Sequence, residues 1–470
     1  MTGLSGWRRV AAALRAFTGS SGERVDGTQG PLGGAVRKLA WPMAMEMVAE
    51  SIFAIVDVFW VARIGIAAVA VVGLGEAAMS FVYAFALGLA IATSALVARQ
   101  VGQSGRLDAA ALPTGQAMSL AILLSFLLGV PACLLAEHVL SAMGADAETA
   151  IAGAPYVRVL FAGNLSVTLM FICGASLRAA GHAGVPMRAL WMANGLNIVL
   201  APLFIFGIGS WHGMGVAGAA AATVCSRGLG VVYQLRYLAR GRDGIGLRWH
   251  HLRPVPAILK RVIRIAWTGA LQMLVASTSA IGLYAIAARS GNVALAGCTI
   301  ALRASQFVLV PSLGVARAAA VLVGQNLGAG QPDRAASAVR FTVAVNVGVF
   351  GTMGVILFVA ARAVASALTH DPLVIEEATR AMRVVACAFP FYAAGMCLQG
   401  AFNGAGDTST PAWTNFTCFW LLQVPLAWVL AVPAGLGTFG LYVGVTIGFA
   451  VLAFCSGALF LRGRWKVHAI

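Results

Sequence analysis

Three carboxylates lie in the first long apolar segment of this chain, at Glu46, Glu50 and Asp57. In an α-helix their spacing of four and seven residues places all three on one face, within about 40° of one another. An Asp, Lys or Arg at the centre of a membrane helix costs roughly 2.5–3.5 kcal/mol on insertion scales. We therefore expect this face to turn toward a cavity or a protein partner, where carboxylates can bind cations or exchange protons.

Asp57 is the strongest candidate for coupling to an ion. Its sequence neighbours include Ile55, Val56, Val58 and Phe59. Desolvation by such neighbours disfavours the charged carboxylate, which would let the group exchange a proton near neutral pH. The alternative is a structural hydrogen-bond anchor. For Glu46 and Glu50 the alternative is that they line a water-filled cavity and take no part in coupling to an ion.

Polar partners for Asp57 occur at a matching depth in the fifth and sixth apolar segments. Asn194 and Asn197 are three residues apart on one helical face, and Thr223 follows a run rich in glycine and alanine. We expect Asp57 to be largely buried and within hydrogen-bond or one-water reach of Asn197 or Thr223. An asparagine in a membrane helix is more often a link between helices than a ligand.

The composition is that of a membrane protein, with 60% hydrophobic residues, 10% charged residues and a mean hydropathy of +0.86. A spanning helix needs about 20 predominantly apolar residues. Segments of this kind occupy 38–62, 66–98, 115–136, 150–178, 187–208, 215–239, 262–288, 293–325, 338–361, 375–402, 411–432 and 438–461. We predict an all-α membrane protein of twelve transmembrane helices in two pseudo-symmetric six-helix lobes. The predicted divisions are a tail at 1–35, an N-lobe at 36–239, a linker at 240–261, a C-lobe at 262–461 and a tail at 462–470.

An internal repeat supports the two lobes. Lys38-Leu39-Ala40-Trp41 returns as Arg264-Ile265-Ala266-Trp267, a shift of 226 residues, and Ala180-Gly181 returns as Ala405-Gly406, a shift of 225. Six helices per half is an even number, so the two halves enter the membrane from the same side and the repeats are parallel. The 226-residue shift carries the three acids onto uncharged residues, Gln272, Ala276 and Leu283, of which Gln272 is a candidate cavity or gate residue. We therefore expect an ion site in the N-lobe alone.

The formal charge of +16 is distributed unevenly. Lys and Arg cluster in the N-terminal arm, the central linker, the C-terminal tail and the short loops on the same side, whereas the opposite loops carry only Arg63, Arg289 and Arg362. By the positive-inside rule both termini are cytoplasmic, in a multi-pass protein of the plasma (inner) membrane. This placement makes a nucleic-acid partner unlikely to explain the charge.

Catalytic and cofactor motifs are missing from the sequence. It contains no phosphate-binding G-x-x-x-x-G-K-[ST], no metal-ligand spacing of His and Cys, and no acid/base pair in a soluble domain. We expect neither an enzyme nor a bound cofactor or metal, and an ion gradient as the energy source.

Glu76 and Arg303 occupy nearly equivalent positions of the two halves, since 76 + 226 = 302. Both lie about a third of the way into their helices, where a lone charge is costly. One hypothesis is a latch that bridges the lobes when the gate on the side opposite the termini is closed. The other gives each residue its own water-lined niche.

Several motifs resemble the multidrug and toxic compound extrusion (MATE) transporters, in their DinF-like branch. The likeness covers roughly 36–461 and is carried by Leu39-Ala40-Trp41-Pro42, Val56-Asp57-Val58-Phe59, Ala68 to Gly73, Thr93 to Val97, Gly102, Arg178-Ala179-Ala180-Gly181 with Pro186, Asn197 to Gly207, and Asn403 to Thr408. The resemblance implies a monomeric twelve-helix antiporter that expels amphiphilic, often cationic small molecules in exchange for protons or sodium. It implies a cation site at Asp57, Asn197 and Thr223.

The chain departs from the family pattern at three positions. The acid that usually follows Asn197 by four residues is Ala201, and Glu50 is a candidate replacement for it. The acids of sodium-coupled members would fall at Ala276 and near Tyr392, which makes sodium the lesser option.

Two other classes remain open from the sequence. A flippase or exporter of a lipid-linked or other endogenous metabolite would favour a cationic cavity, for which Arg227, Arg303 and Arg317 are available. A membrane enzyme would need a catalytic constellation, which the chain lacks.

Overall fold

The apolar segments fold as helices because a backbone in lipid must satisfy its hydrogen bonds within its own segment. The computed structural model describes residues 24–240 and 244–468, and within these ranges the regular elements are all helical. The predicted tails at 1–35 and 462–470 and the linker at 240–261 lie partly outside the described residues. The first half contains α2 (Leu32–Ala62), α3 (Ile66–Ser104), α4 (Ala111–Leu134), α5 (Ala136–Ala142), α6 (Ala147–Ala162), α7 (Asn164–Ala179), α8 (Gly184–Phe206) and α9 (Val216–Ala239).

The second half contains α10 (Pro256–Arg289), α11 (Asn292–Gly328), α12 (Pro332–Leu368), α13 (Pro372–Ala386), α14 (Phe389–Ala405), α15 (Ser409–Asn415), a π-helical stretch (Phe416–Gln423), α16 (Val424–Ala431) and α17 (Gly437–Leu461). Short 3-10 turns lie at Asp108–Ala110, Trp249–Leu252 and Arg464–Val467.

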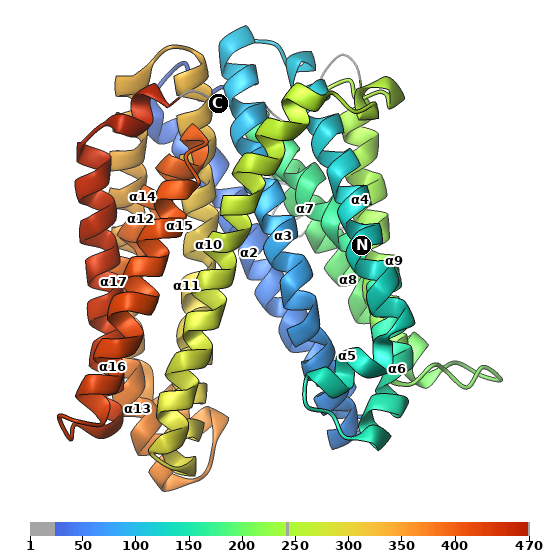
Figure 1. Ribbon diagram of the computed structural model, residues 1–470, viewed down its shortest axis with the longest axis vertical. Helices are drawn as coiled ribbons and strands as arrows, with labels where there is room; N and C mark the ends of the chain where they lie inside the picture. The colour runs from blue at the N-terminus through green and yellow to red at the C-terminus, as the bar shows by residue number, and fades with distance from the viewer. Residues whose placement is uncertain (1–23, 241–243, 469–470) are drawn as a thin grey trace, which may run out of the picture.

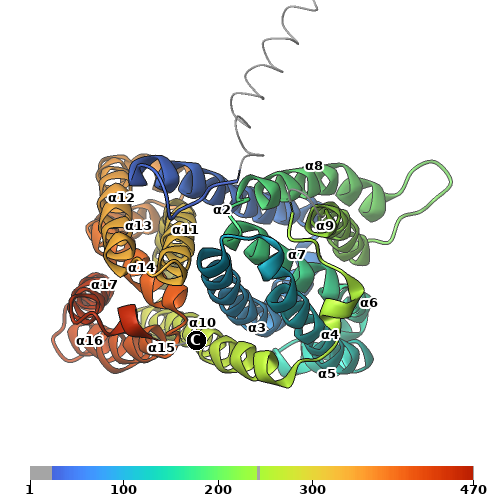
Figure 2. The ribbon, with the colours of Figure 1, turned by 90° about the horizontal axis from the view of Figure 1, so that it is seen from above.

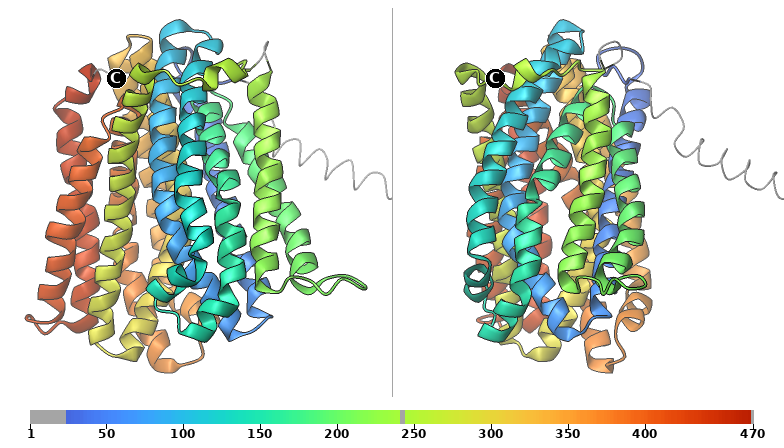
Figure 3. Two further views of the ribbon diagram at one scale, coloured as in Figure 1. Left: turned by 45° about the vertical axis from the view of Figure 1, so that its right-hand side comes forward. Right: turned by 90° about the vertical axis from the view of Figure 1, so that its right-hand side faces the viewer.

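Most of these helices are candidate membrane spans. In the described ranges ten helices are long and apolar enough to cross a membrane, and α13 with α14, bent by 49°, adds an eleventh. The charged helix α2 is the twelfth and runs through the bundle beside them (Figure 1). The prediction of two six-helix lobes is confirmed. The turned views of Figure 3 show the helices of both lobes following one common direction, with the connections at the two ends.

Helices α2 and α10 lie at the two seams between the lobes. Seen from above, the helices from α3 to α9 form one group and those from α11 to α17 the other (Figure 2). Helix α2 packs against α8 of its own lobe and α11 of the other, and α10 packs against α3 and α15. Each lobe therefore holds the first helix of the other half against its own surface.

Glycines bring the lobes into backbone contact on the side where the described chain ends. A Cβ on Gly88 would overlap the backbone of Ala266 and Ala270, and a Cβ on Gly102 would overlap the carbonyl of Gln325. A Cβ on Gly314 would likewise overlap the Met43 carbonyl. Toward the other end the two groups of helices diverge (Figure 1). The lobes are thus closed on the side of the termini.

The segment before α2 reinforces this closure. The amide of Val25 donates to the Gly181 carbonyl of the first lobe at 3.1 Å. The Gly27 amide donates to Gln325 Oε1 of the second lobe at 2.9 Å, and Gln325 Nε2 donates to the Ala179 carbonyl at 2.9 Å. One extended segment and one glutamine therefore connect both lobes at this face.

We expect Gly102→Val to hold the lobes apart on the side of the termini, because a side chain there cannot share space with the Gln325 backbone. The measurement is a pulsed EPR distance between spin labels at Ser104 and Ala329, in a background without native cysteines. The expected result is a longer and broader distance distribution. Gly195→Val is the matched control, since Gly195 of α8 has no atom within 4 Å of its Cβ position. An unchanged distribution for Gly102→Val would contradict the close approach.

Candidate functional site

Glu46 lies on the face of α2 that turns into the protein, where Arg178 at the end of α7 neutralises it. Their atoms Oε1 and Nη1 are 2.6 Å apart, and the two side chains are 11% and 6% exposed, respectively. A pair this buried and this close is a charge-assisted hydrogen bond between helices. Glu46 is therefore a structural partner of Arg178 in this conformation.

Glu50, one turn further along α2, is paired with Arg227 of α9. Two nitrogens of the guanidinium donate to the two carboxylate oxygens at 3.2 and 2.9 Å. The guanidinium also lies 4.8 Å from the centre of the Phe53 ring, a cation–π contact. Because Arg227 takes both oxygens, the expectation that Glu50 replaces the acid missing at Ala201 finds no support in this geometry.

The two asparagines of α8 link helices. Asn194 Nδ2 donates to the Ala49 carbonyl of α2 at 2.7 Å. Asn197 Nδ2 donates to Thr223 Oγ1 of α9 at 3.3 Å, so these two predicted site residues do meet. The remaining Asn197 oxygen is buried without a hydrogen-bond partner among the described residues.

Asp57 stands apart from this pair. It is mostly buried, and no hydrogen bond or ion pair joins it to Asn197, to Thr223 or to another described residue. The predicted hydrogen bond is therefore not formed in this conformation, and reach through one water stays a prediction. Burial is incomplete because this part of α2 lies toward the end where the lobes diverge. Of the three α2 acids, Asp57 is the one that makes no ion pair among the described residues.

The charges of Asp57, Arg227 and Glu50 act on the carboxylate of Glu76 in α3. It is exposed, and so is Arg303 of α11, with no ion pair between them in the described structure. The predicted latch is absent from this conformation, in which the lobes diverge at the end where the two residues lie. Its formation in the opposite conformation stays a prediction.

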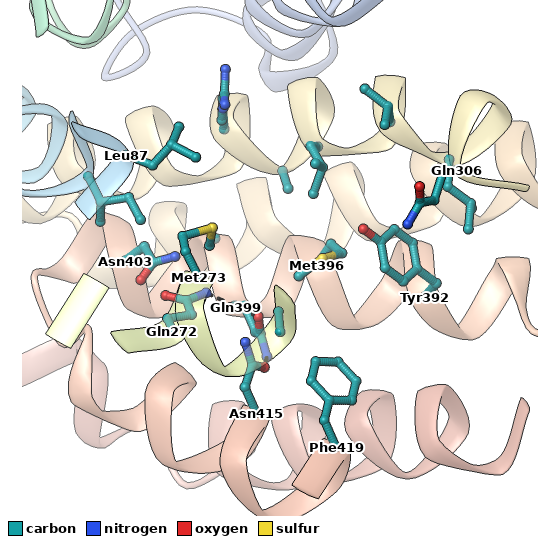
Figure 4. A pocket seen from close by; sticks show the side chains of 18 of the residues that line it. Leu87, Gln272, Met273, Gln306, Tyr392, Met396, Gln399, Asn403, Asn415 and Phe419 are labelled. Atoms are coloured by element: carbon teal, nitrogen blue, oxygen red, sulfur yellow. Dashed lines mark hydrogen bonds between the residues drawn. The ribbon is translucent and has the colours of Figure 1, made fainter. Parts of the chain in front are cut away.

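A cavity of about 420 Å³ lies mainly in the second lobe. Its lining combines apolar and aromatic side chains with carboxamides, and its charged members are the two arginines Arg178 and Arg317. No carboxylate lines it. The polar members shown in Figure 4 are Gln272, Gln306, Tyr392, Gln399, Asn403 and Asn415.

Three of the carboxamides form a buried chain across three helices. Gln272 Nε2 of α10 donates to Gln399 Oε1 of α14 at 3.3 Å, and Gln399 Nε2 donates to Asn415 Oδ1 of α15. The predicted cavity residue Gln272 thus lines the cavity and is 1% exposed. Two oxygens of this region, Gln272 Oε1 and Asn403 Oδ1, are buried without a hydrogen-bond partner.

Sequence reasoning did not find the roles of Arg178 and Arg227. From sequence Arg178 is part of a family motif and Arg227 a candidate cation of a flippase cavity, yet each neutralises one acid of α2. The available signal was physical, because a buried carboxylate in a membrane protein needs a basic partner or a proton. Which arginine reaches which acid depends on how α7 and α9 pack around α2.

The sequence profile of the MatE family matches residues 42–203 and again residues 269–429, which places its two copies 269 − 42 = 227 residues apart. This chain is 26% identical to the probable multidrug resistance protein NorM of Thermotoga maritima, over 92% of this chain and 93% of that protein. It is 24% identical to a protein of Shewanella oneidensis named as an FAD transporter, over 84% and 88%.

A solved structure described as the outward-facing conformation of a multidrug resistance MATE family transporter matches with a TM-score of 0.87. The identity is 26%, and the match covers 94% of this chain and 97% of that one. The double family match, the paired six-helix lobes and the full-length relatives all agree. The chain belongs to the MatE family of multidrug efflux transporters, multi-pass membrane proteins that carry small molecules and are not enzymes.

Proposed function

We propose that this transporter is a proton-driven antiporter that exports amphiphilic small molecules by alternating access. The observation that carries the proposal is the carboxylate of Asp57, which makes no ion pair among the described residues while Glu46 and Glu50 each make one. A group of this kind can change its protonation without breaking an ion pair. It needs no bound cofactor, because the proton gradient is the energy source.

In the proposed cycle, proton binding and cargo binding favour different arrangements of the N-lobe and therefore oppose each other. Protonation of Asp57 removes a charge from α2 and favours one arrangement of this helix, and cargo binding favours the arrangement that releases the proton. Each ligand then shifts the equilibrium only by its difference in affinity for the two states. Sodium is the lesser candidate for the driving ion, because Ala276 and Tyr392 replace the acids of a C-lobe sodium site.

The proposed setting is the plasma (inner) membrane, with a monomer whose termini are both cytoplasmic. In that orientation the closed side of the structure faces the cytoplasm and the diverging side faces out. The neighbouring structure described as outward-facing supports this assignment. Arg24 and Arg334, which lie at the closed face, add to the basic side of the molecule.

The family resemblance implies cargo that is often cationic, which the three acids of α2 could attract. Two of them are neutralised by arginines, so the acid face by itself no longer supports a preference for cations. Export of an endogenous metabolite is the second candidate function, because Arg317 lines a cavity without carboxylates and a relative is named as an FAD transporter.

The test is transport in proteoliposomes under separate proton and sodium gradients, with a panel of neutral, cationic and anionic dyes. We expect an inward-directed proton gradient to raise the initial export rate by at least about tenfold, equivalent to about 1.4 kcal/mol of coupling. A sodium gradient at constant pH should have no effect. Export that follows sodium, or that ignores both gradients, would contradict proton coupling.

A further inference from the structure

The cavity of the second lobe occupies the positions that carry the acids in the first. The 226-residue repeat relates Glu46 to Gln272, Glu50 to Ala276 and Asp57 to Leu283, and all three of the second-lobe residues line the cavity. The cavity is therefore the counterpart of the acidic face of α2, with its charges removed position by position.

The basic partner of Glu46 is replaced as well. The 225-residue shift that relates Ala180 to Ala405 carries Arg178 onto Asn403, since 178 + 225 = 403. The ion pair of Glu46 and Arg178 thus corresponds to two carboxamides, Gln272 and Asn403, both of which line the cavity. In the first lobe these positions form an ion pair, although Glu46 Oε2 has no hydrogen-bond partner among the described residues. In the second lobe Gln272 Oε1 and Asn403 Oδ1 are both buried without a partner among those residues.

A buried polar atom without a hydrogen-bond partner destabilises the structure relative to one that is hydrogen-bonded. Gln272 and Asn403 lie together at one end of the cavity, next to Gln399 and Asn415 (Figure 4). Since the two unpaired atoms are carboxamide oxygens, which accept, this end can complete its hydrogen bonds with a neutral ligand that offers an N–H donor. A permanent charge would find no counter-ion among these groups.

The rest of the lining suits a flat apolar body. Met273 and Met396 lie between the carboxamides and Tyr392 (Figure 4), and flexible thioethers adapt to aromatic surfaces. Tyr392 and Phe419 each make an edge-to-face contact with Phe449, which keeps these rings in place. The volume of about 420 Å³ is in the range of pockets for small organic molecules.

We infer that the second-lobe cavity binds uncharged, planar heteroaromatic molecules that hydrogen-bond to Gln272, Gln399 and Asn403 through an N–H or C=O group. This inference names the cargo class and rests on the proposed function only in assuming that a bound molecule is exported. Of the two arginines in the lining, Arg178 is neutralised by Glu46. Arg317 makes no ion pair among the described residues, so an anionic ligand is the competing occupant that the test below separates.

The test uses three tricyclic probes that share one ring system and differ in charge. Acridone is neutral and carries one N–H and one C=O, an aminoacridine is cationic at neutral pH, and acridone-acetic acid is anionic. Binding is measured by fluorescence anisotropy on the full-length protein in nanodiscs, without any gradient. We expect acridone to bind at least about tenfold more tightly than either charged probe.

The carboxamide variants then locate the site. Gln399→Met should weaken acridone binding about five- to tenfold, the value of one or two neutral hydrogen bonds. Gln272→Glu, assayed at pH 8, should reverse the preference toward the aminoacridine. Gln234→Met is the matched control, because Gln234 is an equally buried glutamine of α9 outside the cavity whose only hydrogen-bond partner in the described structure is the Met170 sulfur, at 3.8 Å.

Two results would overturn the inference. One is acridone binding that Gln399→Met and Gln234→Met alter equally, and the other is tighter binding of the anionic probe that Arg317→Met removes. Because these binding measurements need no gradient, a result that overturns the cargo inference would not contradict proton-driven transport. Conversely, acridone binding combined with gradient-independent transport would refute the proposed antiport alone.

Discussion

Asp57→Asn is expected to abolish export driven by a proton gradient while the protein still folds and binds cargo. The substitution keeps the size of the side chain and removes its titration. Stability should change little, because Asp57 makes no ion pair or hydrogen bond with another described residue that the substitution could break. Because the amide cannot exchange a proton, the free-energy link between the two ligands disappears.

The measurement compares net export with cargo exchange in proteoliposomes. We expect gradient-driven export to fall at least about a hundredfold, equivalent to about 2.8 kcal/mol, and exchange of labelled for unlabelled cargo to persist. Glu76→Gln is the matched control, since it removes a neighbouring acid of α3 and should leave part of the coupling. If Asp57→Asn keeps full export with an unchanged pH dependence, Asp57 has no part in the mechanism.

Arg178→Met is expected to destabilise the protein strongly, by about 3–5 kcal/mol, because it leaves the buried Glu46 carboxylate without its partner. The loss should appear as a lower apparent free energy of unfolding in mixed micelles titrated with dodecyl sulfate. Replacement of both residues, in Glu46→Met with Arg178→Met, should recover most of it, because an apolar pair removes the unpaired charge together with its partner.

A double-mutant cycle separates this pairing from general damage. The exposed pair of Arg106 and Asp108, with side chains 75% and 56% exposed, is the matched control, and its disruption should leave stability unchanged. Additive effects of the two Glu46 and Arg178 substitutions would show that the pair does not stabilise the first lobe.

The architecture followed from sequence because its causes are local and periodic. Apolar length determines which segments span a membrane, and the return of Lys38 to Trp41 as Arg264 to Trp267 reveals two equivalent halves. The acids of α2 were identifiable for the same reason, since a spacing of four and seven residues decides which side chains share a helical face.

The partners of those acids were decided only by tertiary packing. The spacing along α2 does not distinguish Glu46, Glu50 and Asp57 from one another. In the folded protein α7 brings Arg178 to Glu46, and α9 brings Arg227 to Glu50. The amide chain from Gln272 through Gln399 to Asn415 likewise joins helices up to 143 residues apart. Charges and hydrogen bonds act over a few ångströms, so their pairing depends on how helices distant in sequence meet. Residue spacing is enough to place three acids on one face of α2, whereas the packing of α7 and α9 leaves Asp57 as the one without an ion pair among the described residues.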